Sequence, residues 1–305
     1  MKKIGFCFLI YDEIVLEELW NIFFKNVDTE KYGIYIHYKI NKPLKYFENY
    51  KLKECVETKY ADVTLIYAHN LLFKEALNDG CYKIISLSQN CVPLKSFNYI
   101  YKYLTKDCYG HFNVMPDRQC FPRCNNLLEF YDRSHIKKSS NWFILNRTIC
   151  DVIVNTKKED IEKYYGNIGS PEEHFYITTV YKNYLEKEIK MTPNLSNGAT
   201  TFTNWPDMMN YKYPFRPNIG DRMPKHYNSI DKEELLHLIK SECLFGRKFT
   251  KECYQSFVNI EYMNMLNENK EVYNIGFETK LEETEKLDLN LGRIMRSIYN
   301  LNIIT

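Results

Sequence analysis

The hydrophobic pattern of the first ninety residues alternates between strand-length apolar runs and segments with helical spacing. Continuous or alternating apolar residues predict strands at residues 4–10, 32–38, 61–67 and 82–88. Apolar residues that recur every three or four positions predict helices at residues 15–24 and 70–79, the second ended by Gly80. Strands that alternate with helices predict an α/β fold with a mostly parallel central sheet and helices on both faces.

The second half of the chain is less regular. Residues 111–133 contain two prolines, two cysteines and three arginines, which predicts a long surface loop of the kind that often carries function. The other predicted elements are a strand or helix start at 141–146, a helix at 148–165 ended near Gly166 and an amphipathic helix at 231–240. Ligands of such folds bind beyond the carboxyl ends of the strands, so the loop at residues 88–94 is expected to border a site.

Composition excludes several classes of protein. The 41 Lys and Arg nearly balance the 39 Asp and Glu, giving a net charge of +2, so no general attraction to nucleic acid or membranes is expected. Because no glycine-rich loop follows a predicted strand, neither the dinucleotide fingerprint nor a P-loop is present. The apolar run at residues 4–10 is too short to span a membrane and lacks a cleavage site, which predicts a cytoplasmic protein. Abundant Tyr, Lys and Asn indicate an AT-rich genome, such as that of a large DNA virus or a protist.

Ten cysteines are present. A chain of 305 residues without a secretion signal does not need disulfides for stability, so free thiols are expected. Cys120 and Cys124 are close in sequence, but no second Cys/His pair follows at ligand spacing. A structural zinc site is therefore not expected.

The sequence SPEEHFY at residues 170–176 has two interpretations. Ser170, Pro171 and Glu173 match a capping box, in which Glu173 hydrogen-bonds the Ser170 backbone N–H at a helix start. The same carboxylates could instead serve acid/base chemistry. Adjacent helical side chains point about 100° apart, so Glu172 and Glu173 are not expected to act together as a dyad, and the local sequence alone favours the cap.

Seven stretches, in order, resemble the Core-2/I-branching β-1,6-N-acetylglucosaminyltransferase family, its plant relatives and the peptide-O-xylosyltransferases. The blocks are FCFLI with LWNIFF, YGIYIH, the segment 84–104 that starts IISLSQNCVPLKSF, KKSSNWFILNR, SPEEHFY, TTFTNW and LFGRKF. Together they cover most of residues 4–255, whereas the last fifty residues match no family block.

The resemblance implies a GT-A-like fold and an inverting, metal-independent transfer of sugar from a nucleotide sugar to a glycan hydroxyl. UDP-GlcNAc and UDP-xylose are the leading donors. Residues 1–305 then form one domain, with a nucleotide-sugar-binding half at 1–110, an acceptor and catalytic half at 111–255 and an extension at 256–305. In this family the second Glu of the SPEEH-like motif is the general base, which corresponds to Glu173, and the Lys of the FGRKF-like block, here Lys248, holds the diphosphate.

The residue types fit this chemistry. No Asp-x-Asp pair for a divalent ion occurs in the chain, so cations of the protein would have to stabilise the departing diphosphate. Arg247 and Lys248 lie between apolar residues, an unusual place for two charges unless they face a cleft; a solvated turn is the alternative. For a second diphosphate cation, Lys225 has the family's approximate spacing and Arg222 the better fork geometry.

Further candidates for donor or acceptor binding follow from the blocks, each with a structural alternative. Trp205 could stack on a sugar face or be buried. The remaining candidates are Glu172, Ser139, Ser140 with a loop-capping alternative, Arg123 in the long loop, and His37, for which a half-buried packing role is favoured. Lys39 and Cys91 stand where relatives carry acidic residues, so specificity for the donor base is not carried over.

Two rival functions compete with this prediction. One is a catalytically silent carbohydrate-binding protein on the same scaffold. The other is a metal-dependent transferase using Asp160 and Glu162, but these residues lie two apart on a predicted helix and point in different directions.

Overall fold

The structure is a computed structural model that describes residues 1–121, 123–190, 200–205 and 223–268. The chain divides into two compact units, Met1–Asn267 and Glu268–Thr305. The helices and strands named below belong to the first unit.

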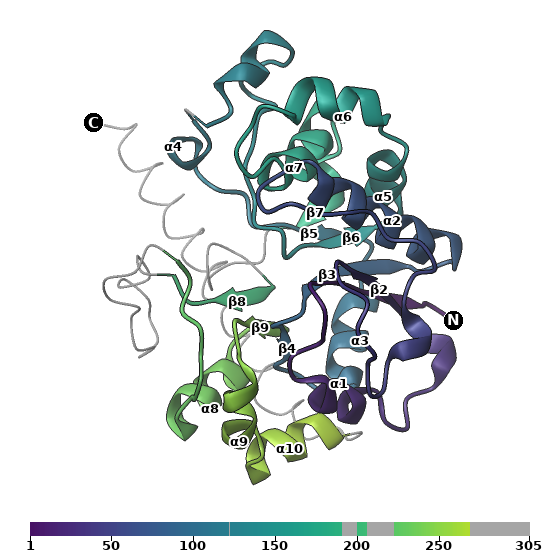
Figure 1. The fold of residues 1–305 in the computed structure, drawn as a ribbon, viewed down its shortest axis with the longest axis vertical. Helices are drawn as coiled ribbons and strands as arrows, with labels where there is room; N and C mark the ends of the chain where they lie inside the picture. The colour runs from purple at the N-terminus through teal and green to yellow at the C-terminus, as the bar shows by residue number, and fades with distance from the viewer. Residues whose placement is uncertain (122, 191–199, 206–222, 269–305) are drawn as a thin grey trace, which may run out of the picture. The chain divides into compact units, whose positions relative to one another are not determined.

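A mixed six-stranded sheet forms the centre of this unit (Figure 1). Its order is β2-β1-β3-β6-β5-β7. The strands are β1 (Ile4–Ile10), β2 (Tyr32–Tyr38), β3 (Lys83–Ser88), β5 (Gly110–His111), β6 (Ile144–Asn146) and β7 (Ile189–Lys190). β1 pairs in parallel with β2 and β3, and β5 with β7, while β6 runs antiparallel to β3 and β5. The predicted α/β class with predominantly parallel pairing is confirmed.

A second, smaller sheet has the order β4-β9-β8. Its strands are β4 (Val92–Pro93), β8 (Thr201–Thr203) and β9 (Phe245–Arg247). β9 pairs in parallel with β8 and antiparallel with β4. Because β4 directly follows the loop after β3, this sheet brings residues near 247 to the loop predicted to border a site.

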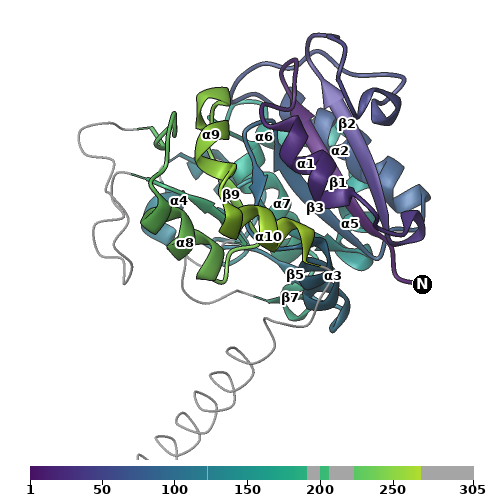
Figure 2. The ribbon, with the colours of Figure 1, turned by 90° about the horizontal axis from the view of Figure 1, so that it is seen from below.

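Helices cover both faces of the central sheet (Figures 1 and 2). One face carries α1 (Glu17–Phe24) and α3 (Phe97–Thr105), with the C-terminal helices beyond them; the other carries α2 (Thr64–Asn78), α5 (Arg147–Val154) and α7 (Glu172–Lys182). The other helices are α4 (Asp117–Cys120), α6 (Lys158–Tyr165), α8 (Lys232–Lys240), α9 (Tyr254–Phe257) and α10 (Ile260–Asn267), and the 3₁₀ turns are η1 (Thr29–Lys31), η2 (Glu48–Tyr50), η3 (Asn125–Glu129), η4 (Glu186–Glu188) and η6 (Lys251–Cys253). Of the helices in the described ranges, none has the length and apolar content to cross a membrane.

The central strands are buried on both faces, which explains their continuous apolar runs. Side chains alternate between the two faces of a strand, so Phe6 and Phe8 of β1 enter one core while Cys7 enters the other. Phe8 packs edge-on against Trp20 of α1 with ring centroids 4.9 Å apart. The sheet therefore separates two hydrophobic cores.

The strand predicted at residues 61–67 is wrong, because this segment starts helix α2. Its Val, Thr and Ile favour a strand locally, but the buried residues Ile66, His69, Leu72, Phe73 and Ala76 continue at helical spacing. Asp62 Oδ1 accepts a hydrogen bond from the Thr64 N–H at 3.0 Å, which satisfies an unpaired donor near the helix start. The buried residues that show the helical spacing lie mostly after residue 67, outside the segment from which the strand was predicted.

The single helix predicted at 148–165 is two helices, α5 and α6. Asn155 ends α5, and its side chain donates to the Asp151 carbonyl at 2.9 Å. Lys157 then takes an extended backbone before α6 begins. Short polar side chains compete with the backbone hydrogen bonds of a helix, and the bond from the Asn155 side chain to the Asp151 carbonyl does so at the end of α5.

The predicted surface loop at 111–133 is partly ordered and partly buried. It contains α4 and η3, and Cys120, Cys124 and Leu127 are at most 1% exposed. These side chains belong to the core beneath α7, so the segment is anchored where a surface loop was expected. All ten cysteines are free thiols, as predicted.

Replacing Gly80 with Ala is expected to lower the free energy of unfolding by about 1–2 kcal/mol. Gly80 follows α2 with φ +75°, and an added Cβ would meet no atom within 4 Å, so only backbone strain opposes it. Gly169→Ala is the matched control, because its Cβ also has open space and its φ is not positive. Equal denaturant midpoints for the two variants would contradict the expectation.

Candidate functional site

The N-terminus of α7 presents Glu172 and Glu173, but the predicted capping box is wrong. Pro171 is the N-cap and no side chain caps the helix. Ser170 has φ +55°, and its N–H is directed to the Ala61 carbonyl at 3.4 Å. The Glu173 N–H donates to the Ser170 carbonyl instead of the hydroxyl. The Glu173 carboxylate therefore has no capping role.

Glu173 Oε2 lies between two cations. Arg123 Nη1 is 2.9 Å away and Lys138 Nζ is 3.3 Å away. The Glu173 side chain is 23% exposed, so a ligand can reach it. Its backbone carbonyl accepts from the Ser139 N–H at 2.8 Å, which fixes the helix start against residues 137–142.

Glu172 has a different environment. It is 6% exposed, Asn141 Nδ2 donates to its Oε1 at 3.4 Å, and its Oε2 has no partner among the described residues. Burial, with a smaller contribution from the charge of Glu173, raises the pKa of Glu172 to about 7. The two neighbouring carboxylates thus differ in access: Glu172 is buried, whereas Glu173 is partly exposed and ion-paired.

Residues 137–142 connect α7 to the small sheet. Ser140 donates from its N–H and its Oγ to Asn113 Oδ1, both at 2.9 Å, and Ser139 is 1% exposed. At the end of this segment, the Trp142 ring lies 4.0 Å beneath the Arg247 guanidinium carbon. One short segment therefore contacts both the predicted base and the predicted cation pair.

Arg247 ends β9 and Lys248 follows it. Arg247 is 8% exposed and its Nε has no partner among the described residues. Burial lowers the pKa of Arg247 to about 10, and burial together with the charge of Arg247 lowers the pKa of Lys248 to about 8. No carboxylate of the described residues forms an ion pair with either side chain. The alternative of a solvated turn is therefore wrong for Arg247, which is buried beside Trp142 and the loop after β3.

The loop after β3 packs against this cation pair. Asn90 Nδ2 donates to the Phe249 carbonyl at 3.0 Å, and the Phe249 N–H donates to the Asn90 carbonyl at 3.2 Å. The predicted border loop thus lies directly beside Lys248. Cys91 in this loop is fully buried, and burial raises the pKa of its thiol.

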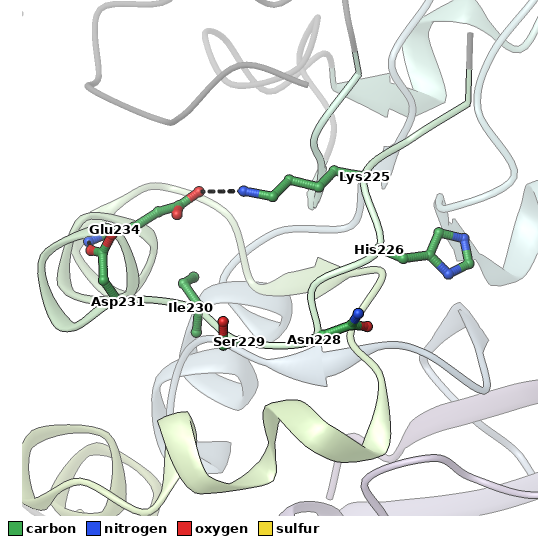
Figure 3. Close-up of a pocket in the computed structure, with 7 residues that line it drawn as sticks. All are labelled: Lys225, His226, Asn228, Ser229, Ile230, Asp231 and Glu234. Carbon is green, nitrogen blue, oxygen red and sulfur yellow. Dashed lines mark hydrogen bonds and ion pairs between the residues drawn. The ribbon is translucent and has the colours of Figure 1, made fainter. Parts of the chain in front are cut away.

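Lys225 lies near Lys248 through the backbone but directs its charge elsewhere. Its N–H donates to the Asn204 carbonyl at 2.8 Å, and the Tyr227 N–H donates to the Lys248 carbonyl at 2.8 Å. Its ammonium is 4.0 Å from Glu234 Oε1 and 4.2 Å from the Tyr227 ring centre. Figure 3 shows Lys225 extending toward Glu234 in an open pocket, with His226 on the opposite side. Trp205, next to Asn204, is 39% exposed, and Arg222 lies outside the described residues.

His37 is fully buried in β2, and its Nε2 accepts from the Val56 N–H at 2.9 Å. Burial lowers the pKa of His37 to about 4 and that of nearby His69 to about 3. Both rings are therefore neutral near pH 7. The buried position agrees with the packing role that was favoured for His37.

Three buried or half-buried polar side chains that the sequence did not single out accompany Glu172. His69, Tyr176 and Asn141 each carry a buried polar atom with no partner among the described residues. The His69 and Tyr176 rings meet edge to face at 5.9 Å. Leaving such groups unpaired costs about 1–3 kcal/mol each. The one sequence signal was a histidine on the apolar stripe of residues 64–78.

One cluster in the described chain has metal-ligand chemistry. Cys120, Cys124 and His174 offer ligand atoms that all lie within 4.8 Å of one another. The sequence argument against zinc missed His174, fifty residues away. The rival pair behaves differently: Glu162 forms an exposed ion pair with Lys158 and accepts from Tyr67, and Asp160 does not join it in such a cluster.

Comparison with known proteins identifies the family of the chain. The model of the Core-2/I-branching enzyme family matches residues 4–238. The rice (Oryza sativa subsp. japonica) protein "Glycosyltransferase BC10" is 21% identical, with 82% of this chain and 74% of the rice protein covered. The solved galactosyltransferase LgtC, in complex with donor and acceptor sugar analogues, matches with TM-score 0.36 and 8% identity over 58% of this chain and 70% of its own; so distant a likeness carries no argument about the site.

The family match defines a glycosyltransferase, and its architecture is mixed α/β with a six-stranded central sheet. The chain belongs to the Core-2/I-branching enzyme family, because the family model covers well over half of its length.

Proposed function

We propose that this glycosyltransferase moves GlcNAc or xylose from a UDP-sugar to a hydroxyl of a glycan acceptor, with inversion and without a catalytic metal ion. Glu173 takes the proton of the attacking hydroxyl. Lys248 and Arg247 stabilise the departing diphosphate, with Lys225 or Arg222 as a further cation. The observation that carries the proposal is the shared contact of residues 137–142 with Glu173 and with Arg247.

Access supports Glu173 over Glu172 as the base. A general base must come within hydrogen-bond reach of the proton that it removes. Glu173 is 23% exposed, whereas Glu172 is 6% exposed beneath it. The ion pairs with Arg123 and Lys138 orient the Glu173 carboxylate at this exposed position. Glu172 fits a supporting role in which it orients Asn141 beside the donor or acceptor.

Charge supports the metal-independent mechanism. A departing diphosphate needs positive charge, and Arg247 and Lys248 supply it without a carboxylate of the described residues to neutralise them. Their lowered pKa values reflect the cost of holding two neighbouring cations away from water, and a bound diphosphate would offset that cost. Lys225 contributes less in this arrangement, because Glu234 already faces it.

Acceptor binding is assigned to the exposed groups near this pair. Trp205 is 39% exposed and offers a ring face for the apolar C–H surface of a sugar. Arg123 contacts Glu173 and is 45% exposed, so it can donate to an acceptor hydroxyl while it orients the base. Ser140 lines the side of the donor sugar, and the buried Ser139 supports that side through its N–H bond to the Glu173 carbonyl.

A panel of nucleotide sugars tests the proposal. UDP-GlcNAc or UDP-xylose at about one hundred times its Kd should add about 2.7 kcal/mol to the free energy of unfolding, seen as a raised Tm, and should be slowly hydrolysed to UDP. The absence of any shift with UDP and the UDP-sugars would refute the donor assignment. A glycan that raises the Tm without UDP release on any acceptor would favour the carbohydrate-binding alternative.

Metal dependence is tested separately. Turnover should be the same with Mg²⁺, with Mn²⁺ and with EDTA during a short assay. Activity that is lost in EDTA and restored by Mg²⁺ or Mn²⁺ would overturn the metal-independent mechanism.

A further inference from the structure

Two segments far apart in sequence place a Cys-Cys-His cluster beneath the start of α7. Cys120 ends α4, Cys124 follows four residues later, and His174 lies in the first turn of α7. The two sulfur atoms are 3.1 Å apart, and Cys120 Sγ is 3.7 Å from His174 Nδ1. All three side chains are at most 1% exposed.

The spacing suits a tetrahedral zinc ion. Zn–S bonds of about 2.3 Å and Zn–N bonds of about 2.0–2.1 Å place two ligand sulfurs about 3.8 Å apart and a sulfur and a nitrogen about 3.5 Å apart. The observed sulfur–sulfur separation of 3.1 Å is shorter than this by less than an ångström, and one ligand atom of each of the three side chains lies within 4.8 Å of the others, so side-chain adjustments suffice to accommodate the ion. Thiolate and imidazole ligands are also the set that selects zinc among common metals.

The histidine has an unused lone pair. His174 Nδ1 is 3.1 Å from the Lys137 carbonyl oxygen, a bond that requires Nδ1 to carry the proton. His174 Nε2 then has a lone pair, and it is buried without a partner among the described residues. A backbone carbonyl that orients one ring nitrogen is the usual support of a metal-binding histidine, and an unpaired buried nitrogen has a cost that a metal would remove.

We propose that Cys120, Cys124 and His174 bind one zinc ion, with a water molecule or a backbone carbonyl as the fourth ligand. The ion has a structural role, because its ligands are closed to solvent. Arg123 lies between the two cysteines in sequence and Glu173 directly precedes His174. Zinc would therefore clamp both partners of the 2.9 Å ion pair between Arg123 and Glu173, and with them the orientation of the proposed base.

Metal binding to the full-length protein tests the site directly. The reduced, chelator-treated protein is titrated with Zn²⁺ against a chromophoric chelator and, separately, with Co²⁺. We expect one metal ion per chain, and a Co²⁺ spectrum with intense tetrahedral d–d bands and thiolate charge transfer. Zn²⁺ should also raise the Tm by mass action.

Matched variants locate the ion. Cys120→Ser, Cys124→Ser and His174→Ala should each weaken binding at least about tenfold, the lower bound for losing even a supporting group of a metal site. Cys243→Ser, at a fully buried cysteine in the other core, should bind zinc as the wild type does. If a ligand variant fails to fold, the Co²⁺ spectrum of the wild-type protein still shows whether thiolates bind the metal ion.

Three results would overturn the zinc site. They are no stoichiometric metal in the reduced wild-type protein, unchanged affinity in the ligand variants, and a Cys120–Cys124 disulfide in the protein as purified, detected by peptide mapping. None of them bears on the donor assignment, which the nucleotide-sugar panel tests by itself. Activity lost in prolonged chelation and restored by Zn²⁺, but not by Mg²⁺ or Mn²⁺, would support the clamp.

Discussion

Glu173→Gln is expected to lower kcat by about 10²- to 10⁴-fold while the protein remains folded. Gln keeps the size of the side chain and can still accept from Arg123 and Lys138, but it cannot take a proton from the acceptor hydroxyl. Because Glu173 caps nothing in α7, the substitution removes no helix-start bond. Transfer to a glycan acceptor, with the Tm measured alongside, checks both parts of the expectation.

Two further variants serve as controls for the loss of kcat in Glu173→Gln. Glu159→Gln changes an exposed carboxylate in the first turn of α6, far from the proposed chemistry, and should leave kcat unaltered. Glu172→Gln should cause a smaller loss than Glu173→Gln, since Glu172 is too buried to reach the acceptor. A larger loss for Glu172→Gln would transfer the base to that residue, and a fully active Glu173→Gln enzyme would end the assignment.

The fold was predictable where the hydrophobic pattern of a few consecutive residues is enough to identify a strand or helix. The strands at residues 4–10 and 32–38 agree with prediction to the residue. The first is a continuous apolar run that is buried almost throughout, and the second is a seven-residue segment rich in Tyr and Ile, which favour strands. The segment 61–67 was misread because its decisive partners, Leu72, Phe73 and Ala76, lie outside it. The break between α5 and α6 depends on one side-chain bond of Asn155, which hydrophobic periodicity does not report.

The sequence indicates candidate site residues one by one but not their arrangement. The motif blocks indicate Glu173 and Lys248 individually. The contacts that join them, Ser139 to Glu173 and Trp142 to Arg247, span about thirty and one hundred residues and arise from the sheet order. The Cys120, Cys124 and His174 cluster escaped prediction for the same reason: spacing rules find residues that are close in sequence, whereas His174 reaches Cys120 through tertiary packing.

Lys248→Ala is expected to lower kcat/KM by about 10²- to 10³-fold, the usual loss when one electrostatic stabiliser of a leaving group is removed. The Tm should not fall. Among the described residues Lys248 has no ion-pair partner, and burial beside Arg247 already disfavours its charge. Its structural bond, from the Tyr227 N–H, goes to the backbone carbonyl that Ala retains. A lower Tm for Lys248→Ala would indicate that the lysine has a packing role.

The same lysine predicts a pH dependence of UDP affinity. Burial and the charge of Arg247 lower the pKa of Lys248 to about 8, so in the free enzyme its charged fraction falls from about nine-tenths at pH 7 to about one-tenth at pH 9. Diphosphate binds the charged form. UDP affinity should therefore fall about tenfold over this range and change little below pH 7, as measured by calorimetry.

Lys248→Arg is the control that separates this charge from other titrating groups. A guanidinium stays protonated throughout the range, so the variant should bind UDP with a flat profile between pH 7 and pH 9, even if the fit is poorer. A tenfold fall that persists in Lys248→Arg would place the titration elsewhere. A wild-type profile that is already flat would mean that the bound diphosphate does not contact Lys248, and the cation role would pass to Arg247 alone.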